Sequence, residues 1–392
     1  MTYANNHSLP AEILEPIIAD GLEALPGLIE TLVNVAMQIE RQRHLGVGPY
    51  ERSSERRGYA NGYKPKTVAT RIGKLTFDVP QVREGGFYPN ALEKGLRSER
   101  ALKLALAEMY VQGVSTRRVR KITEELCGFE VSSTQVSQAT ASLDEQLAAW
   151  RERPLEASPY IWLDAHYEKV RQDGQVRDVA VLKAVGLNGA GQRVVLGISV
   201  SLSEHEVHWR NFLQSLAQRG LRAVRLIISD AHAGLKAARQ AVCGGVPWQR
   251  CQFHLQQNAQ GYVPRKALKL EVAADIRAIF NAADRPQAER LLKETVEKYQ
   301  ESAPQLASWL EANIPEGLTV FDFPAKHQRR LRTVNGLERL HREIRRRSRR
   351  VVVLFPNVAS CERLATAIVM EISDEWETGR VYLSLETNSD GR

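Results

Sequence analysis

The sequence of 392 residues has little cysteine and no long apolar run, and each shortage excludes a class of protein. Its four cysteines, Cys127, Cys243, Cys251 and Cys361, are too few and too scattered for a disulfide scaffold and fit a reducing compartment. The start, MTYANNHSLPAEIL, lacks the basic and apolar segments of a signal peptide. No apolar run approaches the ~20 residues that span a bilayer. We therefore expect a cytoplasmic protein with no membrane contact.

Acidic residues are outnumbered by basic ones, 46 against 54, which gives a formal charge of +8. The excess is clustered, most clearly in TVNGLERLHREIRRRSRR at 333–350, and clustering favours a polyanionic partner. Residues 41–83 are basic and aromatic, a combination that suits nucleic acid but also a solvated hairpin. There we predict turns over 58–66 and short strands over 70–82, broken at Pro80.

Helical patterns fill the first 150 residues. Apolar residues at helical spacing between 10 and 45 predict a helix that contributes to a core or an oligomer contact: Ile13, Ile17, Leu28, Leu32, Val35 and Ile39. Three further helices, over 101–113, 115–128 and 132–147, have the spacing of a helix-turn-helix, although a plain three-helix bundle fits as well. The residues expected to contact DNA are Ser133, Thr134, Gln135 and Gln138 on the last helix, with Arg117 and Arg118 on the one before.

The pattern changes to strands after Pro159. Three β-rich segments, a helix (208–220), a buried strand (223–229) and another helix predict a mixed sheet with helices on its faces. Helical segments then occupy about 255–314, and we interpret them as an insertion that separates this sheet from the arginine-rich helix.

Three carboxylates stand out in this arrangement. Asp164 and Asp230 each end a predicted strand, so neighbouring strands would bring them together, and Glu338 opens the arginine-rich helix. Grouped carboxylates bind Mg²⁺ or Mn²⁺, and two such ions suit phosphodiester chemistry. Structural explanations remain open for all three: a strand–turn junction for Asp164, a helix N-cap for Asp230, and a capping box from Asn335 to Glu338.

Five segments in order resemble the mutator-type transposases of bacterial insertion sequences, which are related to the Mutator-like elements. They are GVSTRRVRKITEELCGFEVSSTQVS, WLDAHYEKVR, LIISDAHAGL, WQRCQFHLQQN and TVNGLERLHREIRRRSRRVVVLFPN, within a collinear match from about Arg52 to Trp376. The C-x-x-H after the second Asp and the N-x-x-E before the basic run make the resemblance specific.

The resemblance implies a ribonuclease H-like α/β catalytic domain with a D-D-E triad formed by Asp164, Asp230 and Glu338, which bind two Mg²⁺ or Mn²⁺ ions and no organic cofactor. It places Cys251, His254, His232 and Asn335 in supporting positions, while Arg342, Arg345, Arg346 and Arg349 are expected to hold DNA phosphates. The expected divisions are 1–95 (N-terminal helices and basic hairpin), 96–150 (helix-turn-helix), 151–257 and 331–392 (catalytic domain) and 258–330 (helical insertion).

The implied function is transposition. The protein would bind terminal inverted repeats of double-stranded DNA, hydrolyse a phosphodiester and join the freed 3′-OH to a second one, by a copy-out, paste-in route through a circular intermediate. A homodimer is expected when two ends are held together. A metal-dependent nuclease and a domesticated DNA-binding regulator are the alternatives.

Overall fold

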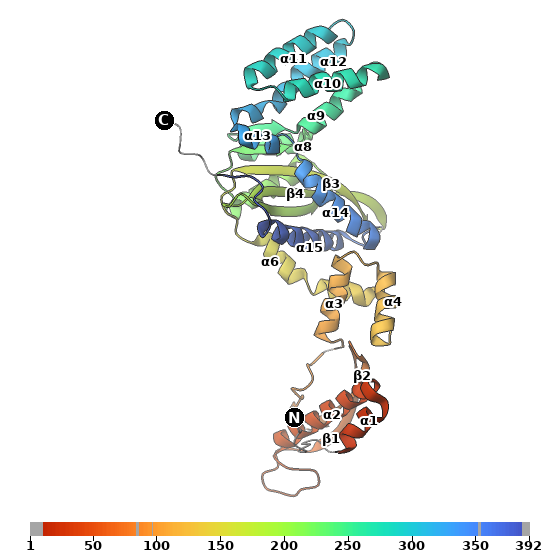
Figure 1. Cartoon of the computed structure of the whole chain (residues 1–392). Helices are drawn as coiled ribbons and strands as arrows, with labels where there is room; N and C mark the ends of the chain where they lie inside the picture. The colour runs from red at the N-terminus through yellow and green to blue at the C-terminus, as the bar shows by residue number, and fades with distance from the viewer. Residues whose placement is uncertain (1–10, 84–85, 96, 352–353, 386–392) are drawn as a thin grey trace, which may run out of the picture. The chain divides into compact units, whose positions relative to one another are not determined.

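The computed structural model describes residues 11–83, 86–95, 97–351 and 354–385 (Figure 1). The chain forms two compact units that divide between Ser142 and Leu143. Within the described ranges, no helix is both long enough and apolar enough to cross a membrane.

The first unit begins with helices that pack on a β-hairpin. Its elements are α1 (Ala11–Asp20), a 3-10 turn (Gly21–Ala24), α2 (Leu25–Leu45), β1 (Ala60–Thr70) and β2 (Gly73–Val82), the two strands being antiparallel. Met37 on α2 is fully buried against Val68, Leu75 and Phe77 of the hairpin. The hairpin is thus an amphipathic ribbon whose apolar face needs the helix to cover it.

The hairpin corrects two expectations. Residues 60–66 belong to β1 and not to turns, and Pro80 lies inside β2 without breaking it. The physical reason is the free edge of β2, where Thr76 N–H donates to Glu30 Oε1 (2.5 Å) and Asp78 N–H donates to Asn34 Oδ1 (2.9 Å) of α2. Pro80 is the next residue on that edge, and because it has no N–H it leaves no donor unsatisfied.

The predicted apolar stripe of α2 is only partly buried. Leu32, Val35 and Ile39 are exposed, whereas Ile29 and Val33 pack beside Met37 on the hairpin. The face of α2 that packs on the hairpin therefore differs from the predicted apolar face. The side chain of Ile13 lies outside the described residues.

Three short helices complete the first unit: α3 (Arg100–Val111), α4 (Thr116–Cys127) and α5 (Ser133–Ala141). The predicted serine caps are confirmed, because Ser115 Oγ accepts from Arg118 N–H and Ser132 forms a capping box with Gln135. The last helix is shorter than predicted. It ends at Ala141, where Ser142 Oγ bonds to Ala139 O and competes with the helical backbone, and α6 (Asp144–Glu152) belongs to the second unit.

The second unit contains the predicted mixed sheet, with strands in the order β5-β4-β3-β6-β7. They are β3 (Tyr160–Gln172), β4 (Gln175–Leu187), β5 (Arg193–Ser201), β6 (Leu226–Ser229) and β7 (Trp248–Arg250). Neighbours among β3, β4 and β5 are antiparallel, while β6 is parallel to both β3 and β7. The three-residue strand β7 was not predicted.

Helices flank this sheet. The core beside α7 (Glu206–Gln218) and α8 (Ala233–Cys243) joins Trp209, Leu216 and Leu235 to sheet residues such as Leu163 and Leu182. The helices α14 (Asn335–Val351) and α15 (Val358–Glu377) also contact the sheet, α15 mainly through β5. Arg363 of α15 forms an ion pair with Asp144 (2.5 Å), which anchors α6.

Helices fill the segment between β7 and α14, where the helical insertion was predicted. It contains α9 (Gln252–Ala259), α10 (Lys269–Phe280), α11 (Arg285–Tyr299), α12 (Pro304–Asn313) and α13 (Ala325–Leu331), with 3-10 turns at Gln260–Tyr262, Lys266–Leu268, Ile314–Gly317 and Thr319–Asp322. It has its own apolar core, built around Ile276, Leu306 and Leu310. Trp309 packs at the edge of that core and stacks on Tyr262, with 5.4 Å between ring centroids.

Candidate active site

Sheet register brings the two aspartates together. Leu163 of β3 pairs with Ser229 of β6 in the parallel ladder, and Asp164 and Asp230 are the residues that follow. Asp164 does not end its strand as predicted, because β3 continues to Gln172 along β4 while β6 stops at Ser229. Each carboxylate accepts the next backbone N–H, Ala165 for Asp164 (2.8 Å) and Ala231 for Asp230 (2.7 Å).

Glu338 lies in the first turns of α14, and its side chain is exposed. Together with Asp164 and Asp230 it lines one cavity of about 240 Å³. The three carboxylates therefore come from β3, the loop after β6 and α14, which are far apart in the sequence.

The structural explanations for two of these carboxylates do not hold. The N-cap of α8 is His232, two residues after Asp230. Asn335 is the first residue of α14 and not the residue before it, and the Asn335 N–H donates to Thr333 Oγ1 (3.4 Å). The predicted capping box from Asn335 to Glu338 is therefore not formed. Asn335 is itself exposed.

A buried polar cluster lies beside Asp164. Lys183 of β4, the register partner of Asp164, is fully buried, and its Nζ lies 2.6 Å from Nδ1 of His166. The other ring nitrogen of His166 is 3.2 Å from Glu168 Oε1. Burial lowers the pKa of Lys183, while the carboxylates of Asp164, Glu168 and Glu204 oppose that shift.

His341, one helical turn after Glu338, faces Asp164 directly. Its Nε2 lies 3.2 Å from Asp164 Oδ2, and its ring is tilted against that of His166, with 5.1 Å between centroids. Burial lowers the pKa of His341, and so do the nearby Lys183 and His166. Burial raises the pKa of the Asp164 carboxyl, with Asp230 acting in the same direction and Lys183 and the Ala165 N–H against it.

The C-x-x-H pair connects the sheet to the helix of Glu338. Cys251 is fully buried after β7, its N–H donates to Ser229 O (2.8 Å), and its sulfur accepts from Val334 N–H (3.5 Å). Cys251 thus ties the start of α14 to the strand that precedes Asp230. His254 Nδ1 lies 3.9 Å from Asp230 Oδ2, and Cys251 and the two aspartates raise the pKa of His254 to about 9.

Glu204, at the turn between β5 and α7, is a fourth carboxylate on the cavity. Its Oε2 is 3.7 Å from Nδ1 of His232, and its side chain is largely buried. Gly234 permits this approach, because a Cβ there would stand 2.1 Å from Glu204 O and 2.9 Å from Glu206 N. The loop before α7 is therefore pressed against the start of α8, close to Asp230.

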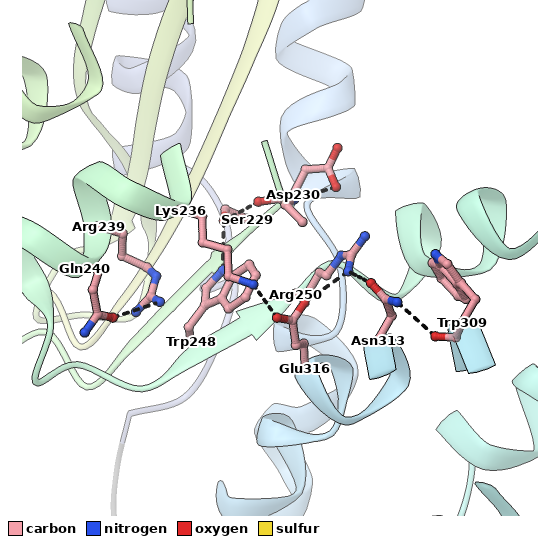
Figure 2. Close-up of polar contacts among 11 residues, drawn as sticks. Ser229, Asp230, Lys236, Arg239, Gln240, Trp248, Arg250, Trp309, Asn313 and Glu316 are labelled. Carbon is pink, nitrogen blue, oxygen red and sulfur yellow. Dashed lines mark hydrogen bonds and ion pairs between the residues drawn. The ribbon is translucent and has the colours of Figure 1, made fainter. Parts of the chain in front are cut away.

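A polar network supports the loop that carries Asp230 (Figure 2). Trp248 Nε1–H donates to Ser229 Oγ (2.9 Å), which in turn donates to Asp230 O (2.8 Å). Lys236 of α8 and Arg250 of β7 both pair with Glu316 of the insertion, at 2.5 Å and 3.0 Å. These ion pairs connect the insertion to the edge of the sheet that carries Asp230.

An arginine groove of about 590 Å³ continues from the cavity. We use the name for the surface lined by Arg342, Arg345, Arg346, Arg349 and Arg350 together with Glu338 and His341. Glu338, His341 and Arg345 line both the groove and the cavity. Arg346 is paired with Glu343 (2.5 Å), whereas buried Arg347 pairs with Glu343 (2.8 Å) and with Glu371 of α15 (2.5 Å). Arg347 thus anchors α14 and the exposed arginines form the groove.

The predicted contacts of the first unit are all exposed. Arg117 and Arg118 lie on α4, and Ser133 and Thr134 begin α5. Gln135 and Gln138 line a cavity of about 360 Å³ shared with α3 and with residues near Arg97, and Gln135 also accepts the Ser132 N–H (2.8 Å). Gln135 therefore caps α5, and its contact with DNA stays a prediction.

The donors at the cavity have the right chemistry for a hard divalent cation, because carboxylate oxygens are the ligands Mg²⁺ prefers. Among the residues that the structure describes, however, no three His, Cys, Asp or Glu side chains are grouped closely enough to hold an ion. The carboxylates therefore suit a divalent cation in their chemistry and in lining one cavity, but the described side chains do not form a coordination shell.

Sequence reasoning missed His341, Glu204 and Lys183, which the structure places at or beside the cavity. His341 had a usable signal, since it lies three residues after Glu338 on the same helical face. Glu204 and Lys183 had none, because a single charged residue in a strand or a turn carries no spacing pattern.

Comparison with known proteins identifies the class. A sequence model described as "Transposase, Mutator family" matches residues 5–379. The chain is 59% identical to the transposase for insertion sequence element IS406 of Burkholderia multivorans over 370 residues, 94% of this chain and 95% of that protein. It is 41% identical to the transposase for ISRM5 of Rhizobium meliloti over 374 residues (95% and 94%), and 34% identical to that for IS256 in Tn4001 of Staphylococcus aureus over 390 residues (97% and 98%).

The chain therefore belongs to the Mutator family of transposases. Its function is that of an insertion-sequence transposase, in DNA transposition.

Proposed function

We propose that the chain is a D-D-E transposase whose second unit is a ribonuclease H-like catalytic domain with Asp164, Asp230 and Glu338 as its catalytic residues. The observation that carries the proposal is the cavity that these three carboxylates line, which opens into the arginine groove. The mixed sheet, in which β3 is antiparallel to β4 and parallel to β6, supports the fold assignment.

The proposed chemistry has two phosphoryl-transfer steps. Water first attacks the phosphodiester at an element end, and the P–O bond to the 3′ oxygen breaks to release a 3′-OH. That 3′-OH then attacks a second phosphodiester and displaces another 3′ oxygen. This second step forms one phosphodiester bond for each one that it breaks. Neither step forms a covalent intermediate with the protein. Two Mg²⁺ or Mn²⁺ ions, held by the three carboxylates, would activate the attacking oxygen and stabilise the leaving one.

The residues of the chain supply position and charge. The exposed arginines of α14 neutralise the DNA backbone next to the carboxylates, so the scissile phosphate is held where Glu338 stands. His341 and the Lys183–His166 pair fix the Asp164 side chain, and Cys251 fixes the start of the Glu338 helix.

Recognition of the element ends is assigned to the first unit. Exposed polar residues at the start of α5 and Arg117 and Arg118 on α4 suit base and phosphate contacts in a helix-turn-helix. Two ends must be held together for strand transfer, so we propose a homodimer on DNA, acting in the bacterial cytoplasm by a copy-out, paste-in route through a circular intermediate.

The direct test incubates the purified chain with labelled duplex that carries an end of its own element and Mg²⁺ or Mn²⁺. We expect a nick at the terminus and joined products, both absent with Glu338→Gln and both present with Glu206→Gln, a carboxylate paired on the surface with Arg210. Nicking without joined products would favour a nuclease. Binding without any metal-dependent product would favour a DNA-binding regulator.

A further inference from the structure

A second basic groove lies in the first unit and differs in character from the arginine groove. It has a volume of about 650 Å³ and lies between the end of α2, the following loop and the start of the hairpin. None of the described residues that line it is acidic. Three arginines and three tyrosines are among them: Arg41, Arg56, Arg83, Tyr50, Tyr59 and Tyr63. We call this surface the tyrosine groove.

The tyrosine rings are presented to solvent. Tyr50 is fully exposed, and Tyr59 and Tyr63 are 62% and 48% exposed. Guanidinium groups lie over two of the rings, Arg56 at 5.4 Å from the centroid of Tyr59 and Arg41 at 4.8 Å from that of Tyr63. Arg41 Nη2 also donates to the Tyr63 hydroxyl (2.9 Å). A cation covers one face of a ring, so the opposite face remains able to stack.

The backbone fixes this arrangement. Gly46 ends α2 with a φ of +72°, and a Cβ there would stand 2.7 Å from Glu55 O, so only glycine lets the loop return. Arg57 N–H then donates to Leu45 O (2.8 Å). The Glu51 carboxylate, one of the two acids of this loop, accepts the Gly48 N–H (2.8 Å).

Tyr50 is held in an unfavourable backbone conformation. Its φ is +61°, a left-handed value that carries a conformational cost for a residue with a Cβ. Packing does not repay that cost, because the side chain is fully exposed. Strain at an unpacked aromatic residue points to a role in binding.

We propose that the tyrosine groove binds an unpaired stretch of DNA, with the tyrosines stacked on bases and the arginines on phosphates. The surplus of arginine selects a polyanion, and the open ring faces select bases that are not already stacked within a duplex. DNA transposition cuts strands, and bases beside a cut can unpair. The inference rests on that function alone and not on the assignment of the three carboxylates.

The test is fluorescence anisotropy with the full chain, without divalent metal, on a labelled oligothymidylate of about 12 nucleotides, a length that single-strand sites cover, and on a duplex of the same length. Tyr59→Ala and Tyr63→Ala should each weaken single-strand binding by roughly tenfold, since one stacked base contributes about 1–3 kcal/mol, and should leave duplex binding nearly unchanged. Tyr59→Phe keeps the ring, and Tyr262→Ala removes an exposed tyrosine from the other unit; both should bind as the unaltered chain does.

Three results would overturn the proposal: unchanged single-strand binding, equal losses on both DNA forms, or competition by polyglutamate as strong as that by single strands, which would indicate an acidic protein partner. If the alanine variants do not fold, a second experiment uses the unaltered chain, which is cross-linked to a single strand that carries 5-iodouracil. Cross-links within residues 46–63 support the proposal, and cross-links only elsewhere contradict it. Because no step requires cleavage, failure here leaves the carboxylate assignment standing, and the reverse also holds.

Discussion

The two basic grooves differ in the side chains that line them, and we propose that they bind different parts of DNA. The arginine groove carries no tyrosine, tryptophan or phenylalanine among the described residues that line it, but it includes Glu338 and adjoins two aspartates. The tyrosine groove has three aromatic rings and no described carboxylate. A surface that only binds a polyanion gains nothing from an acid. We therefore propose that Glu338 marks where the DNA backbone reacts and that the tyrosine rings mark where bases are held.

The largest effect should come from the carboxylates. Asp164→Asn, Asp230→Asn or Glu338→Gln should each reduce strand cleavage about a thousandfold or more, because each removes several kcal/mol of charge stabilisation at about 1.4 kcal/mol per factor of ten. Gel-shift affinity for the element end should remain, since the arginines are untouched. Asp178→Asn, an exposed aspartate on β4, is the control. A variant of the three that cleaves normally would not belong to the active site.

A variant of Glu204 tests whether a fourth carboxylate on the cavity contributes to cleavage. Glu204→Gln should lower the rate of cleavage by about 10- to 100-fold, the usual effect of losing a group that orients metal-binding residues. Single-turnover kinetics on nicked duplex would measure it, with Glu206→Gln as the matched control two residues away. Equal rates in both variants would reduce Glu204 to a partner of His232.

If the arginine groove binds DNA phosphates, its arginines should contribute to the salt dependence of DNA affinity. Arg342→Ala and Arg349→Ala should each reduce the slope of log affinity against log salt by about 0.9, the value for one lost phosphate contact. Arg290→Ala, an exposed arginine of the insertion, should leave the slope unchanged. Slopes that do not respond to Arg342 and Arg349 would mean that DNA does not follow α14.

The smallest expected effect concerns Cys251. Cys251→Ala removes the acceptor of the Val334 N–H and should lower the free energy of unfolding by about 1–3 kcal/mol, with a modest fall in cleavage as the Glu338 helix loosens. Cys243→Ala, a half-buried cysteine of α8, should change both less. Urea unfolding of the two variants measures the difference in stability. If Cys251→Ala changes neither the free energy of unfolding nor the cleavage rate, Cys251 does not position the Glu338 helix.

The strands and helices around the site were predictable where the chain repeats a pattern. Apolar runs ended by aspartates predicted β3 and β6, and a helical period with seven arginines predicted α14. The sequence predicted that Asp164 and Asp230 would meet only if their strands were neighbours, and the structure shows that they are. The strand β7 was missed because three residues carry no period. Residues 60–66 were assigned to turns because glycine and proline usually mark turns, but the two-stranded ribbon tolerates Gly62 and Pro65.

The surroundings of the site depended on tertiary contacts. Lys183 is an isolated lysine in an apolar strand, and only the register of β3 and β4 places it opposite Asp164. Glu204 reaches the cavity because Gly234 yields space to the neighbouring loop. The basic and aromatic composition of residues 41–83 was visible in the sequence. The groove that the tyrosines share depends on the left-handed Gly46 and on the return of the chain at Arg57.

The most direct measurement is Mn²⁺ binding to the complex of the chain with an uncut DNA end, followed by electron paramagnetic resonance. If Glu338 stands among arginines to hold metal, the unaltered chain binds Mn²⁺ at the site and Glu338→Gln loses at least one ion while DNA remains bound. If Glu338→Gln binds as much Mn²⁺ and as tightly as the unaltered chain, Glu338 is not a metal ligand and the central claim is wrong.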